Sequence, residues 1–330
     1  MLQKAERMLT NSHIWVLIAV AFFAVFPVWA PVMWKHLATE IFIIALFAMS
    51  LNMILGRTGL PSFGHASFYC VGGYTAALFM MKLHLPFGIA MIAAPVVAAI
   101  FAAVIGFFSV RLSGIHFAIL TLGFSQLIWA IAHKWYSFTK GDDGITGIPV
   151  PPALQKITPY YYFVFVILIA CLILIRIIQN SPFGHTTVAI RENRERVTFS
   201  GLKVWHHLWL NFVIASFFAG IAGSLLVLLN RSVFPDFGYW TKSAGVVLMC
   251  IFGGVGVFIG PIVGAAIITL LEHYISIYTF YWQMVLGCLI IILVIVLPGG
   301  ICGFIQNSLR GKEEKKIREE VPYASQSRGP

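Results

Sequence analysis

The sequence predicts an all-α protein, a polytopic transmembrane helical bundle of about ten spans with broken or re-entrant segments. Two observations predict this fold. Hydrophobic residues make up 59% of the 330 positions and charged residues only 10%, whereas a soluble domain carries about 25% charged residues. The apolar residues also form continuous runs close to the roughly 20 residues that cross a bilayer. They do not alternate with polar residues as barrel strands would, so the spans must be helices.

The ten predicted spans form one membrane domain over residues 1–309, which a polar loop over residues 181–203 divides. The third, eighth and ninth spans are the weakest, because glycine and serine interrupt them. Residues 310–330 mix both charges and predict a solvated tail. The spans are Ile14–Met33, Leu37–Leu55, Ser62–Met81, Phe87–Val110, Ile115–Trp135, Pro159–Ile178, His206–Leu229, Ser243–Val257, Pro261–Ile277 and Tyr281–Ile301.

The distribution of Lys and Arg predicts the orientation. With the N-terminus inside, fifteen basic residues fall in inner connections and seven in outer ones. This asymmetry predicts that both termini, the loop and the tail are cytoplasmic. The net charge of +10 is therefore mostly an orientation signal. It does not indicate nucleic-acid binding, because the basic residues are scattered among the spans.

Few ionisable side chains fall within the spans. Of twelve acidic residues only Glu40 and Glu272 do. We expect no intramembrane Lys or Arg beside Glu272, and we expect its carboxyl group to be neutral. Ion-coupled carriers usually keep several ionisable groups in the bilayer, so this scarcity argues against a carrier driven by an ion gradient.

No catalytic residues, metal or cofactor are expected on this chain. It contains no GxxxxGK[ST] phosphate-binding loop. Any ATP that drives transport would therefore be bound by another subunit. The five cysteines show neither metal-ligand spacing nor a disulfide framework, and we interpret them as small apolar residues of the spans.

The long loop begins SPFGHTTVAIREN. Ser181 predicts a helix N-cap and Pro182 suits the first helical position, while Gly184 is expected to break that first turn. A second, amphipathic helix is predicted over residues 186–200, with a glycine as its C-cap. Such a helix either docks another protein or lies on the membrane surface.

Helix-breaking and polar residues within the spans point to a cavity. Broken helices at membrane depth are tolerated where they are buried in protein or line a cavity, and their free backbone groups suit a zwitterionic ligand. The predicted breaks are Pro61, Gly64, Gly253, Gly254, Gly260 and Pro261. The polar candidates for a translocation path are Asn52, Ser62, His65, Ser67, Thr121, Ser125, Gln126 and Ser216. For each, the alternative is a structural hydrogen bond worth about 1 kcal/mol or less.

Five segments together resemble the LivM-type permeases, the membrane subunits of branched-chain amino acid ABC importers. In chain order they are LPSFGHASFYCVGGYTAAL (Leu60–Leu78), GDDGITGIP (Gly141–Pro149), the loop start SPFG with its AIREN, GGVGVFIGPIVGA (Gly253–Ala265) and PGGICG (Pro298–Gly303). The chain departs from the family pattern at Ala66 and Val257, where glycine and threonine are frequent.

The resemblance implies an inner-membrane permease subunit, not an enzyme, that moves branched-chain or other hydrophobic amino acids inward. It implies a second, LivH-like permease subunit, two ATPase subunits that bind the ATP, and a periplasmic binding protein. The ATPase-coupling residues carried over are Ser181, Pro182, Gly184, Ala189, Ile190, Arg191 and Glu192. Two alternatives stay open: a urea or short-amide ABC permease, and a self-sufficient secondary carrier or channel.

Overall fold

The computed structural model describes residues 18, 20–281, 283–285, 287–288, 291 and 300–303. Within this part of the chain nearly everything is helical, which confirms the predicted fold class. Six of the described helices are long and apolar enough to cross a membrane. They are α2 (Val32–Thr58), α4 (Phe87–Ser109), α5 (Gly114–Lys134), α7 (Ile157–Asn180), α10 (Val204–Asn230) and α12 (Gly260–Tyr278).

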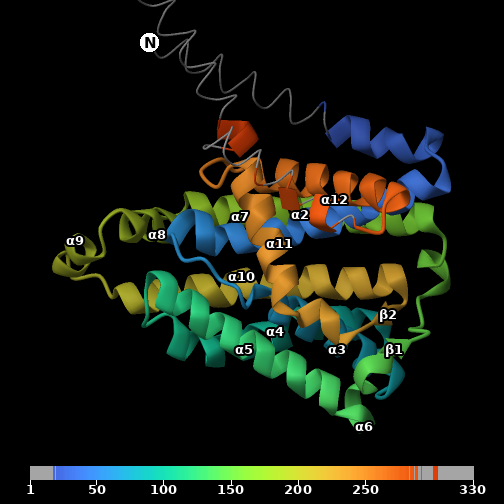
Figure 1. The fold of residues 1–330 in the computed structure, drawn as a ribbon, viewed down its shortest axis with the longest axis horizontal. Coiled ribbons are helices and arrows are strands. Elements are labelled where there is room, and N and C mark those ends of the chain that lie inside the picture. Colours follow the sequence, from blue (N-terminus) through green and yellow to red (C-terminus); the bar gives the residue numbers. More distant parts are fainter. Residues whose placement is uncertain are drawn as a thin grey trace, which may run out of the picture.

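The long helices lie side by side, so the bundle has two distinct ends (Figure 1). One end, which we call the α9 end, carries α8 (Pro182–Glu192) and α9 (Arg194–Phe199). The opposite end, the β1 end, carries α6 (Tyr136–Thr139), η1 (Gly141–Asp143), η2 (Pro152–Leu154) and the strands β1 (Ile145–Thr146) and β2 (Ser232–Val233). The two strands pair antiparallel, with Ile145 opposite Val233.

Basic residues predicted for opposite sides of the membrane lie at opposite ends of the bundle. Arg57 bonds Gln179, the residue before the last of α7, through Nη2 and Oε1 at 3.0 Å; both are at the α9 end. Lys82 bonds the carbonyl oxygen of Ser137 at 2.8 Å at the β1 end. Arg57 and Lys82 therefore lie at opposite ends of the bundle, and which end faces the cytoplasm stays a prediction.

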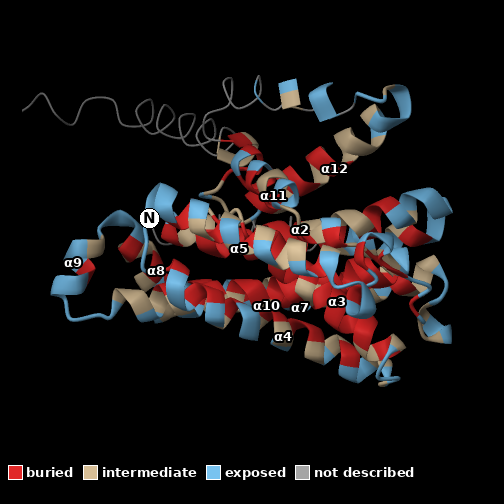
Figure 2. Cartoon of the chain, turned by 60° about the horizontal axis from the view of Figure 1, so that its bottom comes forward, coloured by how far each residue is buried: buried red, intermediate tan, exposed pale blue. Residues whose placement is uncertain are grey.

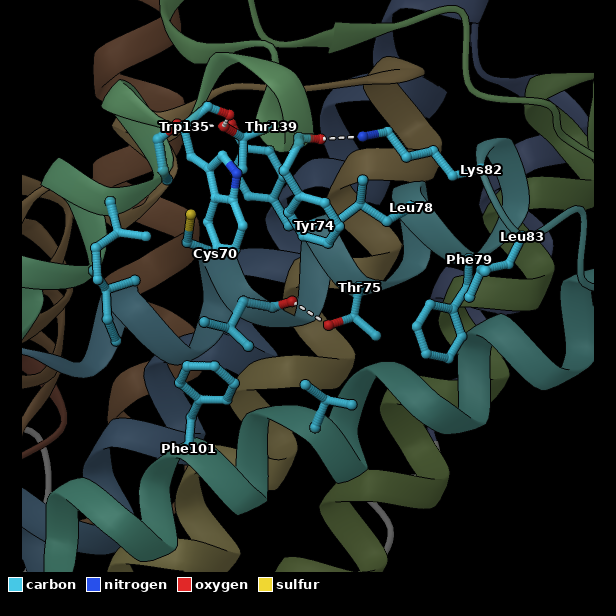
Figure 3. Close-up of a pocket in the computed structure, with 16 residues that line it drawn as sticks. Cys70, Tyr74, Thr75, Leu78, Phe79, Lys82, Leu83, Phe101, Trp135 and Thr139 are labelled. Carbon is cyan, nitrogen blue, oxygen red and sulfur yellow. Dashed lines mark hydrogen bonds between the residues drawn. The ribbon is translucent and has the colours of Figure 1, made fainter.

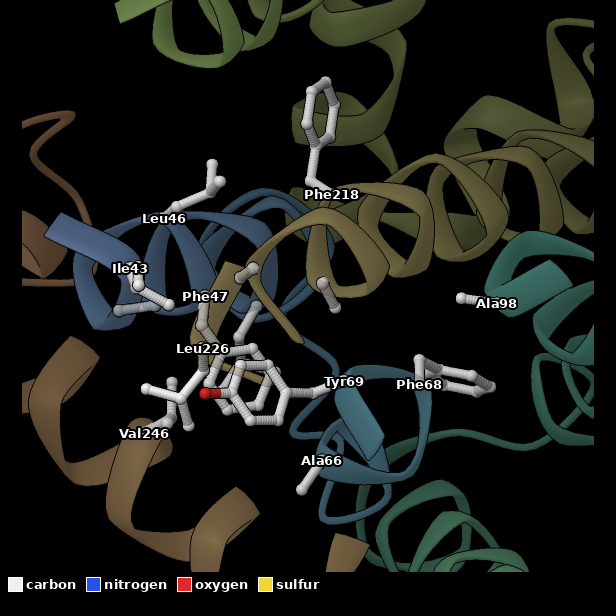
Figure 4. Close-up of a cluster of buried hydrophobic side chains, with 14 of the residues drawn as sticks. Ile43, Leu46, Phe47, Ala66, Phe68, Tyr69, Ala98, Phe218, Leu226 and Val246 are labelled. Atoms are coloured by element: carbon white, nitrogen blue, oxygen red, sulfur yellow. The ribbon is translucent and has the colours of Figure 1, made fainter. Parts of the chain in front are cut away.

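The core is built around α10, which packs against α2, α3 (His65–Met81) and α4 (Figure 2). Figure 4 shows its side chains converging from α2, α3, α4, α10 and α11. Glycines allow the helices to approach closely: a Cβ on Gly72 would collide with Gly220 of α10, and one on Gly223 with the carbonyl oxygen of Tyr69. Helices in lipid associate through such small residues, since apolar surface is not driven out of an apolar solvent.

Some predicted spans have different bounds. A helix over Val20–Trp29 ends before Pro31, so the predicted first span is divided and its last residues belong to α2. The predicted eighth span is α11 (Trp240–Gly253), whose 14 residues extend about 21 Å. That is too short for a hydrocarbon core of about 30 Å.

The remaining span predictions fall partly outside the described residues. Most of the predicted tenth span does so, as do the closing PGGICG motif in part and the whole tail over residues 310–330. The predicted ninth span corresponds to α12, which has 19 residues.

Candidate functional site

The chain re-enters the bundle between α2 and α3. Only residues 59–64 separate the end of α2 from His65, the first residue of α3. The His65 ring lies 2.9 Å from the hydroxyl of Ser50 through Nε2, and Ser50 lies eight residues, about 12 Å, back from the end of α2. The connection, which holds Pro61 and Gly64, therefore climbs back among the helices, and α3 begins inside the bundle.

A second re-entry meets the first. After β2 the chain forms η3 (Pro235–Gly238) and then α11. The carbonyl oxygen of Gly238 accepts a hydrogen bond from the Ser125 hydroxyl at 2.9 Å. The backbone N–H of Ala66 donates to the hydroxyl of Ser243 at 2.8 Å. The N-termini of α3 and α11 thus converge beside α5 within the membrane thickness.

Sequence reasoning missed this second re-entry, and it placed a break instead between α11 and α12. At that predicted position Gly253 ends α11 and Gly254 follows at φ 110°. Gly260 and Pro261 begin α12. The sequence does contain a signal for this second re-entry: Pro235 and Gly238 stand shortly before an apolar run.

Buried polar side chains line the meeting point of the two helix N-termini. We call this group the polar seam; it comprises Ser62, His65, Ser67, Thr121, Ser125 and Ser243. A Cβ on Gly64 would collide with the backbone at Thr121, so α3 and α5 approach each other very closely here. The structure therefore brings most of the predicted path residues together.

Some seam groups have no hydrogen-bond partner among the described residues. Ser67 and Thr121 donate locally, to the carbonyl oxygens of Gly64 at 2.5 Å and Ala118 at 3.0 Å. The Ser62 hydroxyl has no such partner. Neither does Nε2 of Gln126, the residue after Ser125. A buried polar group without a partner costs about 1–3 kcal/mol, which a passing polar ligand would offset.

His65 is enclosed by other side chains. Its ring is fully buried, stacks on Phe47 at 5.5 Å between centroids, and leaves Nδ1 without a partner in the described chain. Two further path candidates lie elsewhere. Asn52 Oδ1 lies beside Gly56 and has no hydrogen-bond partner among the described residues, while the Ser216 hydroxyl donates to the carbonyl oxygen of Phe212 at 2.8 Å.

An exposed carboxylate lies above the seam, toward the β1 end. Asp236 of η3 accepts a hydrogen bond from Trp129 Nε1 at 3.1 Å. The Trp129 ring lies 5.2 Å from that of Tyr239. A carboxylate beside two aromatic rings can bind an ammonium group by charge and by cation–π attraction. Asp236 was not among the predicted path residues, because it lies outside the predicted spans.

Lys242 was predicted to lie in an outer connection, whereas the structure places it in the first turn of α11. Among the described residues, no Lys or Arg lies within 4 Å of the Glu272 carboxylate. The expectation that no basic residue pairs with Glu272 stays a prediction.

An apolar pocket of about 440 Å³ opens between α3, α4 and α5 near the β1 end (Figure 3). Its walls include Tyr74, Leu78, Phe101 and Trp135. Lys82 lies at its edge, bonded to Ser137 and Phe138 carbonyl oxygens. The pocket contains no residue of the polar seam. Its lining suits an aliphatic chain and offers little to a zwitterion, so it is not our candidate for the path.

The long loop folds as two helices, but their boundary differs from the prediction. The Ser181 hydroxyl accepts from the Gly184 N–H at 3.3 Å and caps α8. The predicted break at Gly184 is wrong, because α8 continues to Glu192. Gly184 is needed for packing: a Cβ there would collide with the carbonyl oxygens of Ile178 and Gln179. The break falls at Asn193, whose Oδ1 accepts from the Arg196 N–H at 2.9 Å.

The coupling residues divide into an inner and an outer group. Ile190 is 1% exposed and belongs to the core of the bundle. Arg191 donates from Nη1 to the carbonyl oxygen of Gly56 at 2.6 Å. Glu192 is exposed, and so is Phe199 of α9, at 89%. Phe199 of α9 is therefore an exposed apolar side chain, whereas Ile190 of α8 is buried in the bundle.

Comparisons with known proteins address the family. The family model for the branched-chain amino acid transport system permease component matches residues 33–295. LivM of Salmonella typhimurium, a high-affinity branched-chain amino acid transport system permease protein, is 26% identical over 312 residues, which cover 86% of this chain and 73% of LivM.

LivM of Escherichia coli is 26% identical over 84% of this chain and 71% of its own length. LivH of Escherichia coli is 25% identical over 78% of this chain and 91% of its own. No solved structure matches. Since the family model covers most of a membrane-spanning helical bundle, the chain belongs to the family of branched-chain amino acid transport system permease components.

Proposed function

We propose that this chain is the membrane permease subunit of an ABC importer that moves branched-chain or other hydrophobic amino acids inward. The observation that supports the substrate class is the similarity to LivM proteins along 86% and 84% of the chain. The two helix N-termini that meet at the polar seam agree with a substrate that carries a carboxylate, because the positive end of a helix dipole favours an anion.

The path follows the polar seam. Asp236 beside Trp129 receives the ammonium group of the amino acid at the β1 end. The carboxylate then contacts the N-terminus of α3, the Ser62 hydroxyl and the Gln126 amide. Ser67, Thr121 and Ser125 complete the wall, with Asn52 and His65 on the flanks. Contacts of this kind are weak, and a substrate delivered by another protein must be able to leave.

Separate ATPase subunits drive the movement. The chain has no phosphate-binding loop of the GxxxxGK[ST] kind, so ATP is bound by those subunits. They dock on the loop from Ser181 to Lys203, where Phe199 and the exposed face of α9 provide the contact. Pro182, Gly184, Ala189, Ile190 and Arg191 fix α8 to the bundle, so that a push on α9 reaches the long helices.

The remaining partners follow from this orientation. Both termini and the α9 end face the cytoplasm of a bacterial inner membrane, and the β1 end faces the periplasm. There the segment Gly141–Pro149, held by the β1–β2 pair, offers exposed polar groups to a periplasmic binding protein. A second, LivH-like permease subunit completes the pore.

Uptake in cells that lack this gene tests the proposal. We expect the initial uptake of labelled leucine to fall by at least about tenfold, a loss of about 1.4 kcal/mol of transition-state stabilisation, and to be restored by the gene on a plasmid. Uptake of labelled urea should be unchanged. Loss of urea uptake with intact leucine uptake would establish the urea or short-amide permease instead.

A further inference from the structure

Three hydrogen-bonding side chains meet at the α9 end, where α2 and α7 finish. Arg57 Nη2 donates to Gln179, to Oε1 at 3.0 Å and to the backbone oxygen at 3.4 Å. Arg176 precedes Gln179 by three residues on α7, so the two side chains are neighbours on the helix surface. The charge of Arg176 acts on that of Arg57. Two guanidinium groups and one amide therefore share a small region.

No carboxylate balances these two cations in the part of the chain that the structure describes. There the one ion pair within 4 Å joins His133 and Asp142 at 3.7 Å, at the opposite end of the bundle. The Arg176 guanidinium lies 5.0 Å from the centre of the Phe258 ring. No carboxylate of the described residues lies within 4 Å of it. Like charges at close range repel, so an anion bound between the two arginines would lower the free energy.

Gln179 provides the second observation. Its side chain is 4% exposed, and its amide nitrogen Nε2 has no hydrogen-bond partner among the described residues. Because Oε1 of Gln179 already accepts a hydrogen bond from Arg57, the part of the amide still available is Nε2, which can only donate. A buried donor beside two guanidinium groups fits an oxygen-rich anion such as a phosphate.

The surface of α7 next to this region is apolar, and no other described part of the chain covers it. Val166, Ile173 and Ile177 are 64%, 55% and 61% exposed. On a helix with 3.6 residues per turn, Val166 and Ile173 lie within about a quarter-turn of Arg176. Acyl chains can therefore lie along α7 while a headgroup reaches the arginines. This arrangement distinguishes a lipid phosphate from a free phosphate ion, which would gain nothing from Ile173.

We propose that Arg57, Arg176 and Gln179 bind the phosphodiester of an anionic phospholipid whose acyl chains pack on α7. Arginine forks match phosphate oxygens, and basic sites between transmembrane helices on the cytoplasmic side bind anionic headgroups. The assignment to the cytoplasmic leaflet rests on the proposed orientation; binding itself does not. Because Gly184 of α8 packs on the Gln179 carbonyl, the bound lipid would adjoin the coupling loop.

Lipid titration of the purified full chain tests the site. The chain in a neutral detergent is titrated with phosphatidylglycerol, and bound lipids are counted by native mass spectrometry. Parallel titrations use phosphatidylcholine and inorganic phosphate. The variants are Arg57→Gln and Arg176→Gln. The matched control is Arg111→Gln, since the Arg111 guanidinium also lies over an aromatic ring, Phe107, at 4.4 Å.

We expect one tightly bound phosphatidylglycerol, and at least about fivefold weaker binding in each variant, since a basic residue near the membrane surface contributes about 1 kcal/mol. The Arg111→Gln chain should bind as the parent does, and Arg176→Lys should retain part of the affinity. Phosphatidylcholine and inorganic phosphate should not bind at this site in the parallel titrations, and neither should displace bound phosphatidylglycerol when added in excess. Equal losses in the control would show general charge attraction, and competition by phosphate would show a plain anion site; either result overturns the proposal.

This experiment needs neither ATPase nor substrate, so its failure is distinguishable from failure of the proposed transport function. A variant that does not fold is recognised by a broadened size-exclusion profile. In that case Gln179→Leu, which keeps the volume but removes the N–H donors, provides the same test. It should also weaken phosphatidylglycerol binding, and unchanged binding would contradict the role given to Gln179.

Discussion

The Arg191 guanidinium donates a hydrogen bond to the carbonyl oxygen of Gly56 at 2.6 Å. Gly56 lies in the last turn of α2, where carbonyl groups lack a partner within the helix. The bond therefore satisfies an end of α2 and fastens α8 to the most buried helix of the bundle. A residue in the long loop thus has a structural task distinct from contact with a partner.

Replacing Arg191 should loosen α8 without unfolding the bundle. A hydrogen bond to a charged group contributes about 1.5–3 kcal/mol, so Arg191→Gln should lower leucine uptake by roughly tenfold. Arg111→Gln is the control, because the Arg111 guanidinium lies outside the loop, over the Phe107 ring, and this variant should transport nearly normally. Equal uptake by both variants, at equal amounts in the membrane, would contradict this role for Arg191.

Phe199 should be the main apolar contact with an ATPase subunit. Burying a phenylalanine side chain is worth about 1.5–3 kcal/mol, so Phe199→Ala should weaken co-purification of the ATPase by about 10- to 100-fold. The chain should insert normally, because Phe199 packs on little of its own protein. Ile190→Asp should instead reduce the amount of folded chain, since Ile190 is buried. Normal ATPase binding by Phe199→Ala would place the contact elsewhere.

Gly184 should tolerate no side chain. Gly184→Val would press a Cβ into the carbonyl oxygens at the end of α7, so we expect α8 to detach and uptake to be lost. Gly123→Ala is the matched control, because nothing lies within 4 Å of a Cβ at that site. Protease accessibility of the loop in inside-out vesicles separates detachment of α8 from loss of insertion. A Gly184→Val chain with full uptake would refute the packing argument.

The orientation can be measured with an impermeant thiol reagent. In a chain whose five cysteines are replaced by alanine, a cysteine at Asp143 should be labelled in intact cells. One at Glu195 should be labelled only after the cells are opened. Both parent residues are exposed, so accessibility within the protein does not differ. The reverse pattern would invert the assignment of the α9 and β1 ends.

Transport should depend on ATP and not on an ion gradient. Glu272→Gln should keep most uptake, because a glutamine preserves the shape and the hydrogen-bonding capacity of the side chain. An uncoupler added at constant ATP should leave initial uptake nearly unchanged. Loss of uptake with the uncoupler, or in Glu272→Gln alone, would favour a secondary carrier.

The helical architecture was predictable because the apolar runs match the thickness of a bilayer and few charges interrupt them. The re-entry before α3 was also predictable, since Pro61 and Gly64 interrupt one such run. The entry of η3 into the bundle was not predictable. Pro235 and Gly238 lie in a short connection, and a turn at the membrane surface would have the same composition. The depth of η3 depends on which helices lie beside it, here through the hydrogen bond from Ser125 to the Gly238 carbonyl oxygen, and local sequence does not specify that.

In the long loop, too, local sequence did not specify which residues pack against the bundle. Gly184 looks like a helix breaker in isolation, yet the close approach to α7 requires a glycine inside a continuous helix. Ile190 and Phe199 are both apolar residues of one amphipathic loop, and periodicity does not say which of them contacts the bundle. That distinction comes only from how α8 and α9 turn at Asn193.

The six-residue connection between α2 and α3 has a mechanical consequence. A Cβ on Gly59 would lie 3.2 Å from Cγ of Arg191, and one on Gly64 would collide with Thr121. The connection over residues 59–64 is therefore packed tightly at both ends, against the loop at Gly59 and against α5 at Gly64. Only four residues lie between these two contacts. A displacement of α8 would therefore either bend the connection over residues 59–64 or shift the first turn of α3. We therefore expect a movement of α8 at the membrane surface to shift the N-terminus of α3, which meets that of α11 inside the bundle.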